Sequence, residues 1–258
     1  MTPLSIDVAD LTFHYELHSQ KAVDHVSFNV APGSITGLFG RNGSGKSTVS
    51  MLAAGLLHPT SGTVEVGGQT VYENADLMAS ICYISDSTPV FEDQKASRTL
   101  ELWKASRPCW DADYAKELLD MFKIDPKKRP SRLSRGQLSS FYAVLGLASR
   151  CPITIFDEVH LGMDPVAREM FYMALLADYT KHPRTFILSS HLIEEIEDLL
   201  DSVILMDEGK IIEGGDVDEV RSRHSDEDKV AHLNEILVKM TLSSNDAEHM
   251  NVQKGSKI

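Results

Sequence analysis

Nine consecutive residues near the start of the chain have the types and the spacing that hold a phosphate group. They are Gly40, Arg41, Asn42, Gly43, Ser44, Gly45, Lys46, Ser47 and Thr48, and they fit the pattern G-x-x-x-x-G-K-[ST] in full. Glycines let the backbone turn tightly with its N–H groups pointing inward, and the start of a following helix adds partial positive charge. Lys46 would reach the terminal phosphates, and the Ser47 hydroxyl would bind a magnesium ion that bridges phosphate oxygens. The pattern therefore predicts a nucleotide-binding loop and not merely a glycine-rich turn.

Two acidic residues follow an apolar run much later in the chain. Residues 153–156 read as a buried strand, and Asp157 and Glu158 stand at its end. Buried carboxylates need a charge partner, and bound magnesium is one. We expect Asp157 to hold the metal through water, and Glu158 to orient or deprotonate an attacking water.

Two further residues are interpreted with the help of these motifs. His191 comes directly after a predicted strand at 186–190. Alone it would read as a cap or a surface residue, but with the loop and the two acids present it is better interpreted as a γ-phosphate contact. Tyr15 stands in an alternating segment ahead of the loop, where it either packs in the core or stacks on an adenine ring.

The segment at 133–137 precedes an apolar helix predicted at 138–149. It reads Leu133, Ser134, Arg135, Gly136 and Gln137. Taken alone, it is an N-cap followed by a flexible residue, and that structural interpretation would win. A functional role for the segment is indicated only because the two acids, Asp157 and Glu158, follow about 20 residues later.

The elements around these residues predict an α/β fold. A strand at 34–39 and helix-forming residues at 49–57 flank the loop, and an antiparallel hairpin is expected from 11–17 and 23–30. Further strands are expected at 63–66, 81–85, 153–158 and 186–190, with a closing hairpin at 201–206 and 210–213. Apolar residues at helical spacing from 97 to 150, separated by prolines, indicate a helical subdomain inserted in the core.

These patterns predict a phosphate-loop NTPase core with a mixed, mainly parallel sheet. We expect an ATPase domain over residues 1–222, with its core at 1–90 and 151–215 and its helical subdomain at about 91–150. A polar tail at 223–258 follows. Val230, Leu233, Leu237 and Met240 predict one short amphipathic helix there, packed on its own domain or on a twin subunit, and residues 241–258 look disordered.

Composition excludes several classes of protein. A net charge of −13 argues against a nucleic-acid binder, and the basic cluster at 127–135 reads as a solvated loop. The three cysteines are odd in number and widely spaced, which favours ordinary thiols in a reducing cytoplasm. Because the chain starts without a secretory signal and has no apolar run near the roughly 20 residues that cross a bilayer, we expect a membrane role only through a partner.

Taken together, the motifs resemble the ATPase subunit of an ABC transporter over about residues 4–220. The order of parts is specific: an aromatic like Tyr15, the phosphate loop, a helical lobe, a signature like Leu133 to Gln137, the two acids, a turn at 162–165 like the D-loop, and a switch histidine like His191. The segments around 110–114 and 190–195 look most like stand-alone bacterial exporter subunits that handle antibiotics, peptides or lipids.

The resemblance implies ATP and magnesium as ligands and a head-to-tail dimer, either a homodimer or a heterodimer. The signature residues Ser134, Arg135, Gly136 and Gln137 of one subunit would close over ATP in the other, and Asp164 would stand in the D-loop. Closure would drive a separate multi-span membrane permease, so that the chain works in the cytoplasm on the inner face of the cell membrane.

Four departures from the family pattern stand out. Asp86 occupies the place of a glutamine, where its carboxylate could meet magnesium through water but cannot donate a hydrogen bond. Arg135 replaces a glycine of the signature, and residues 139–141 lack an arginine that the family has there. Residues 159–161, Val-His-Leu, replace Pro-Thr-Ser. We still expect ATP hydrolysis, but with altered coupling between hydrolysis and the movement of the permease.

Two alternatives remain open. A soluble ATP-gated protein acting on ribosomes or DNA is one, although such relatives carry two ATPase units or long coiled coils. A regulatory subunit that binds ATP but scarcely hydrolyses it is the other, because of Asp86 and the altered D-loop.

Overall fold

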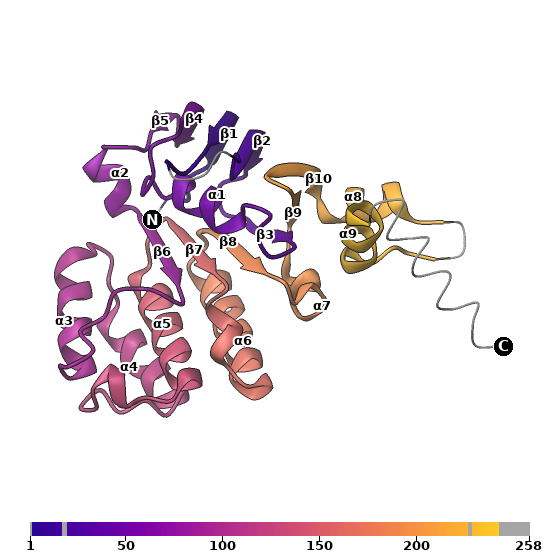
Figure 1. The fold of residues 1–258 in the computed structure, drawn as a ribbon. Helices are drawn as coiled ribbons and strands as arrows, with labels where there is room; N and C mark the ends of the chain where they lie inside the picture. Colours follow the sequence, from indigo (N-terminus) through magenta and orange to yellow (C-terminus); the bar gives the residue numbers. More distant parts are fainter. Residues whose placement is uncertain (1, 17–19, 227–228, 243–258) are drawn as a thin grey trace.

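The larger of two sheets carries the alternating strands and helices of the chain. This computed structural model describes residues 2–16, 20–226 and 229–242 (Figure 1). Six strands pair in the order β10-β9-β3-β8-β7-β6. Their bounds are β3 Ile35–Gly40, β6 Ile81–Ser85, β7 Ile153–Asp157, β8 Thr185–Ser190, β9 Ser202–Asp207 and β10 Lys210–Asp216. All neighbouring pairs are parallel except β9 and β10. Strands β3, β7 and β8 are buried along their whole length because layers cover both faces, which explains their apolar sequences.

A second, antiparallel sheet covers one side of the molecule. It has the order β2-β1-β4-β5, with β1 Ile6–Phe13, β2 Val23–Val30, β4 Ser61–Val66 and β5 Gln69–Thr70. Apolar residues of this sheet, of α1 and of one face of the larger sheet form one core cluster. The predicted α/β fold with an antiparallel N-terminal hairpin is therefore confirmed, although β1 ends at Phe13 and leaves Tyr15 beyond the strand.

The helices form the other layers. They are α1 Lys46–Ala53, α2 Ala75–Ala79, α3 Ala96–Ser106, α4 Ala112–Met121, α5 Arg135–Ser149, α6 Pro165–Lys181, α7 Ile193–Ile196, α8 Val217–His224 and α9 Leu233–Thr241. Short 3-10 turns stand at η1 Pro130–Arg132, η2 Val159–Gly162 and η3 Glu197–Leu199. Figure 1 shows α3, α4 and α5 gathered in a lobe beside β6 and β7, as the inserted helices of the predicted fold require. None of the described helices combines the length and the apolar character that crossing a bilayer demands.

Helix α1 begins earlier and ends earlier than the sequence suggests. It starts at Lys46 inside the phosphate loop and ends at Ala53, whereas residues 49–57 were expected. Gly55 ends it, because this residue has a φ of +72° and its N–H donates to the Leu52 carbonyl.

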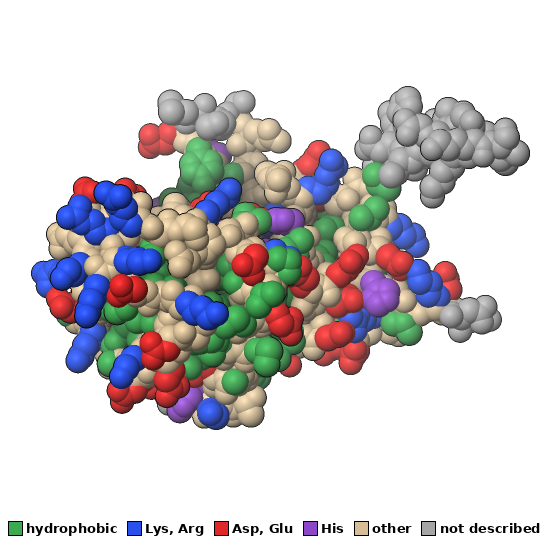
Figure 2. Space-filling model, turned by 90° about the horizontal axis from the view of Figure 1, so that it is seen from below, with side chains coloured by type: hydrophobic (Ala, Val, Ile, Leu, Met, Phe, Trp, Pro, Cys, Tyr) green, Lys and Arg blue, Asp and Glu red, His purple; other side chains and the backbone are tan. Residues whose placement is uncertain are grey.

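Basic side chains gather at one end of the lobe. Figure 2 shows Lys and Arg side chains at the left, on the side of α3 and α4. The basic residues at 127–135 are all exposed, and within the described part of the chain none of them forms an ion pair. The cluster is thus a solvated loop in this subunit.

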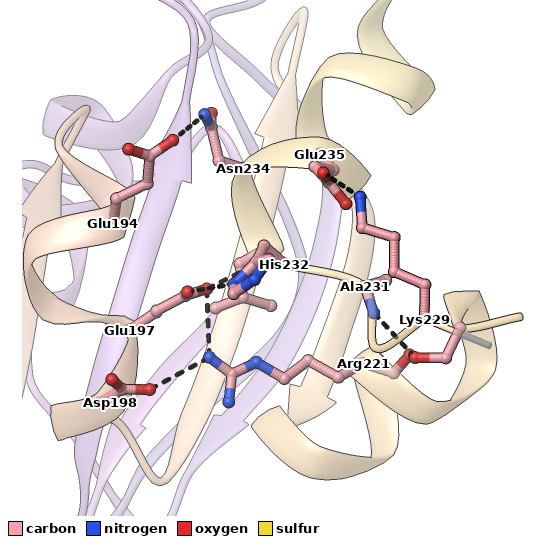
Figure 3. A network of polar contacts seen from close by, with 11 residues as sticks. Glu194, Glu197, Asp198, Arg221, Lys229, Ala231, His232, Asn234 and Glu235 are labelled. Atoms are coloured by element: carbon pink, nitrogen blue, oxygen red, sulfur yellow. Dashed lines mark hydrogen bonds and ion pairs between the residues drawn. The ribbon is translucent and has the colours of Figure 1, made fainter.

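The C-terminal helices pack on the segment that follows β8. Figure 3 shows Glu197 at the centre of this contact. Its carboxylate lies 2.7 Å from the His232 Nδ1, accepts the Leu233 N–H at 3.1 Å and pairs with Arg221 at 3.2 Å. Glu197 thus caps α9 and fastens it to its own domain, one of the two packings expected.

A further helix, α8, spans the expected domain boundary at residue 222, and the sequence pattern did not reveal it. Asp216 caps α8 by accepting the N–H groups of Asp218 and Glu219. The expected disorder at 241–258 lies almost wholly outside the described residues. The domain boundaries at 90, 150 and 222 remain proposals.

Candidate active site

The candidate residues stand at one edge of the larger sheet, where its parallel strands end. Phe39 lies opposite Ser190, and Asp157 lies opposite Ser189 and Ser85. The phosphate loop after β3, the acids after β7, His191 after β8 and Asp86 after β6 therefore leave the sheet at the same side. Crevices at the carboxyl ends of parallel strands are where α/β proteins bind ligands.

The phosphate loop has the backbone of an anion cradle. Gly45 has a φ of +100°, and a Cβ there would stand 2.4 Å from the Ala22 carbonyl oxygen, so only glycine fits. Helix α1 begins directly after Gly45, with neither a side-chain cap nor an acidic residue in its first turn. Its first N–H groups and its positive dipole end are therefore left for a phosphate.

Lys46 is held inside the loop. Its side chain is 4% exposed, and its Nζ donates to the carbonyls of Gly40 at 2.9 Å and Arg41 at 3.1 Å. The Glu158 Oε1 lies 3.7 Å from the same Nζ. A buried ammonium group needs such partners, and they keep the charge at the mouth of the loop.

Replacement of Lys46 by alanine tests this arrangement. We expect Lys46→Ala to weaken ATP binding at least about tenfold, because a hydrogen bond to a charged group contributes about 1.5–3 kcal/mol. Equilibrium titration with a fluorescent ATP analogue measures the affinity of the wild type and of the variant. Lys104→Ala on the exposed face of α3 removes the same charge elsewhere and should leave the affinity unchanged. Equal affinities of the two variants would contradict the phosphate-loop assignment.

A cleft of about 360 Å³ lies over the loop. Its lining includes Tyr15, the loop residues from Asn42 to Thr48 except Ser44, and Glu158. A second hollow of about 530 Å³, lined by Tyr15, Arg41 and the turn at 207–209, adjoins it. The Tyr15 ring packs edge-on against Phe13 and its hydroxyl lies 3.2 Å from the Thr48 Oγ1. Because the side chain is 38% exposed and lines both hollows, its position suits stacking on a base better than core packing.

Asp157 meets the requirements of a metal-holding carboxylate. The Tyr83 hydroxyl donates to its Oδ2 at 2.9 Å, whereas its Oδ1 is buried without a hydrogen-bond partner. Burial, followed by the charge of Asp157, raises the pKa of Tyr83, so this hydroxyl keeps its proton. A buried unpaired carboxylate oxygen is costly, and a cation would offset that cost. The residues present therefore fit magnesium, and the Ser47 hydroxyl, exposed on α1, is a second group that would hold it.

Glu158 sits at a bend in the backbone. It has a φ of +53°, in the left-handed region that non-glycine residues rarely adopt, and its N–H donates to the Ser189 carbonyl at 3.1 Å. This bend ends β7 at the point where the carboxylate reaches the cleft. Strained backbone of this kind is concentrated at functional sites.

The signature residues form a second, separate surface. Ser134 and Gln137 make a reciprocal capping box at the start of α5, each backbone N–H donating to the other's side chain at 3.2 Å. A Cβ on Gly136 would stand 3.0 Å from the Gly162 carbonyl oxygen, so the helix start packs on the D-loop turn. Asp164 caps α6 by accepting the Ala167 N–H.

The structure does not bring all predicted residues together. Among the described residues that line the cleft over the loop there is none from the signature, and Asp86, Asp164 and His191 are also absent from it. Arg135, Asp86 and His191 are exposed. The structural interpretation of the signature as an N-cap thus holds within one subunit, and the functional roles of these residues remain predictions.

Two contributors were missed by sequence reasoning. Tyr83, which orients Asp157, looked like an ordinary strand residue. His160 was noticed only as a departure from the family pattern, yet it is 3% exposed and its ring lies 5.9 Å from that of His191. A histidine at a site where the family has threonine was the available signal.

His160 makes the stability of the protein depend on pH. Burial, and to a lesser degree the neighbouring His191, lowers the pKa of His160 from 6.5 to about 4. The unfolded chain therefore takes up a proton at a higher pH than the folded one, so the free energy of unfolding decreases as pH falls from about 6.5 to 4. A pKa shift of this size corresponds to a change of about 3 kcal/mol in the free energy of unfolding.

Urea denaturation at several pH values measures this dependence. Between pH 4.5 and 6, the free energy of unfolding of His160→Gln should depend less steeply on pH than that of the wild type. The difference in slope should correspond to the uptake of about one proton on unfolding. Parallel slopes in the two proteins would contradict the lowered pKa.

Comparison with known proteins shows the family to which the chain belongs. A family model for ABC transporters matches residues 23–160, more than half of the chain. The chain belongs to the ABC transporter family. Within it, the chain is an ATP-binding subunit and an ATPase. The prediction of the family from the sequence is therefore confirmed.

Individual relatives agree with this assignment. The bacitracin transport ATP-binding protein BcrA of Bacillus licheniformis is 29% identical over 222 residues, which are 85% of this chain and 72% of that protein. A solved ATP-binding subunit of an ABC transporter is 25% identical, with a TM-score of 0.81 over 92% of this chain and 99% of that one. A cassette solved as a dimer in a post-hydrolysis state with ADP and phosphate has a TM-score of 0.73 and 20% identity, over 82% of this chain and 98% of that one. Similarity at this level shows that the ABC ATPase fold is shared.

Proposed function

We propose that this subunit powers an exporter by closing a head-to-tail dimer on ATP. The observation that carries the proposal is the division of the site. The cleft holds the phosphate loop and Glu158, whereas the signature residues stand on a separate surface of the same subunit. Two copies, or this chain and a sister ATPase, would each supply what the other's cleft lacks. The dimeric post-hydrolysis cassette that shares the fold supports this arrangement.

Within one subunit, each residue has a distinct task. The N–H groups at the start of α1 and the Lys46 ammonium bind the phosphates, and Tyr15 covers the base. Magnesium, when bound, neutralises phosphate charge, and Ser47 and Asp157 would hold it. Glu158 orients the attacking water and accepts its proton, and His191 contacts the γ-phosphate.

The signature would act on the partner's ATP. Helix α5 begins at Arg135 and presents the positive end of its dipole, and Ser134 presents a hydroxyl, at an exposed surface. A phosphate group of the partner's ATP would interact favourably with the positive end of the α5 dipole and accept a hydrogen bond from the Ser134 hydroxyl. Arg135, exposed where the family has glycine, adds a full positive charge to this surface.

We propose export as the direction of transport, and a relative that transports an antibiotic supports this choice. BcrA is described as a bacitracin transport protein, and its similarity extends over 85% of this chain. We infer an exporter whose permease is a separate membrane protein, so that this subunit works at the inner face of the cell membrane. Nucleic acid is not expected as a partner, because the chain carries a net charge of −13.

A pull-down from detergent-solubilised native membranes tests the proposal. Tagged Glu158→Gln protein with ATP should retain a multi-span membrane protein, because blocked hydrolysis keeps the dimer closed on its partner. Lys46→Ala protein is the matched control and should retain less. Recovery of ribosomes, DNA or only soluble proteins would overturn the transporter proposal in favour of an ATP-gated interaction protein.

One observation favours a weaker ATPase as a second candidate. Asp86 is exposed at the end of β6, where its carboxylate can accept but not donate hydrogen bonds. A regulatory subunit would bind ATP with a turnover that Glu158→Gln hardly changes. Turnover of the wild type far above that of the variant would exclude it.

A further inference from the structure

His160 connects two loops of the candidate site. It lies in η2, the turn that leads from Glu158 to Asp164, and its side chain is buried. Its Nε2 lies 3.2 Å from the Ser190 Oγ. Ser190 is the last residue of β8, and His191 follows it directly. The contact therefore joins the D-loop turn to the base of the switch histidine.

The Ser190 hydroxyl organises the backbone around His191. Its Oγ accepts the N–H of Leu192 at 2.8 Å, which closes a turn across His191. Since Oγ already accepts this bond, its own O–H can donate to the His160 Nε2 when that nitrogen carries no proton. Ser190 also lies opposite Phe39 of β3, directly before the phosphate loop. The turn that carries His191 is thus fixed from two sides.

We propose that His160 is a positioning residue that holds His191 in its productive orientation through Ser190. The inference rests on the proposed contact of His191 with the γ-phosphate. His160 itself would not touch the nucleotide, because it is 3% exposed and does not line the cleft over the phosphate loop. A displacement of the D-loop turn, as on dimer closure, would reach His191 through the hydrogen bond between His160 and Ser190.

The surroundings of His160 suit a neutral imidazole. Its ring faces His191, and the charges of Glu195 on α7 and Arg168 on α6 act on it from further out. Those two residues are paired with each other, with the Arg168 Nη2 2.7 Å from the Glu195 Oε1. Apolar side chains such as Phe156, Phe171 and Ile196 enclose the remaining space beside the ring. A neutral ring that accepts one hydrogen bond is the state that this pocket stabilises.

Four variants of the full chain test the proposal by steady-state ATP hydrolysis. His160→Leu keeps the volume and removes the hydrogen bond, His160→Gln restores a polar group of similar reach, and Ser190→Ala removes the other partner. We expect His160→Leu and Ser190→Ala to lower kcat about 10- to 100-fold with KM and ATP affinity within twofold of wild type, since misplaced catalytic groups cost about this much. His160→Gln should recover most of kcat. The exposed His182→Leu is the matched control and should leave kcat unchanged.

The His191→Ala background separates positioning from folding. If His160 acts through His191, His160→Leu should cause no further loss of kcat in that background. A multiplicative loss in the double variant, or wild-type kcat in His160→Leu, would overturn the proposal. If His160→Leu fails to fold, His160→Phe decides it in the same two backgrounds, because it keeps a ring, removes the hydrogen bond from Ser190 and leaves the bond from the Leu192 N–H to the Ser190 Oγ in place. Full kcat in His191→Ala alone would instead overturn the role of His191 in the proposed function.

Discussion

The Glu158→Gln variant should bind ATP like the wild type and hydrolyse it about 100- to 10,000-fold more slowly, the usual contribution of a general base. Glu158 is the only acidic side chain, within the described chain, that lines the cleft over the phosphate loop. Glutamine has the same shape and suits the same backbone, but it cannot accept a proton from water. Loss of turnover without loss of binding is therefore the expected result.

Single-turnover hydrolysis and analogue binding measure the two quantities separately. The Glu158 carboxylate also lies 3.7 Å from the Lys46 Nζ, but the Gly40 and Arg41 carbonyls still accept from this ammonium group in the variant, so ATP binding should be kept. Glu169→Gln on the exposed face of α6 removes one negative charge that does not line the cleft and serves as control. A Glu158→Gln turnover within tenfold of wild type would exclude the general-base role.

The parts of the site that depend on backbone spacing could be predicted from the sequence. The glycines of the phosphate loop, Lys46 and the two acids act through fixed positions at strand ends, so residue types and intervals were enough to bring them to one edge of the sheet. The β6 bounds were predicted exactly as observed, at 81–85, because an apolar run between turn residues has few alternatives.

The parts that depend on side chains meeting across the fold could not be predicted. Tyr83 and Asp157 lie 74 positions apart in the sequence, and His160 and Ser190 lie 30 apart. No local pattern indicates such pairs, since they arise from strand order. Helix α8 was missed for a different reason: its apolar residues are few, and its start depends on the Asp216 cap.

A buried charge cluster under the helical lobe gives the largest expected effect on stability. The Asp178 side chain is 1% exposed and pairs with Arg184 at 2.8 Å and with Arg150 at 3.1 Å. Arg184, 3% exposed, also donates to the Leu147 carbonyl. Burial raises the pKa of Asp178 in spite of both arginines, so taking this carboxylate out of water is itself costly.

Asp178→Ala should lower the free energy of unfolding by about 3–5 kcal/mol, because it leaves the buried Arg184 charge without its partner. Asp111→Ala removes a more exposed carboxylate that pairs with Arg150 at 3.4 Å and caps α4 by accepting the Tyr114 N–H, and it should cost about 1–2 kcal/mol. Urea denaturation measures both. The double variant Asp178→Ala, Arg184→Met should regain much of the loss, since removing both charges also removes the unpaired one. If the single and double variants were equally stable, the loss of stability would come from lost packing around Asp178 and not from the unpaired Arg184 charge.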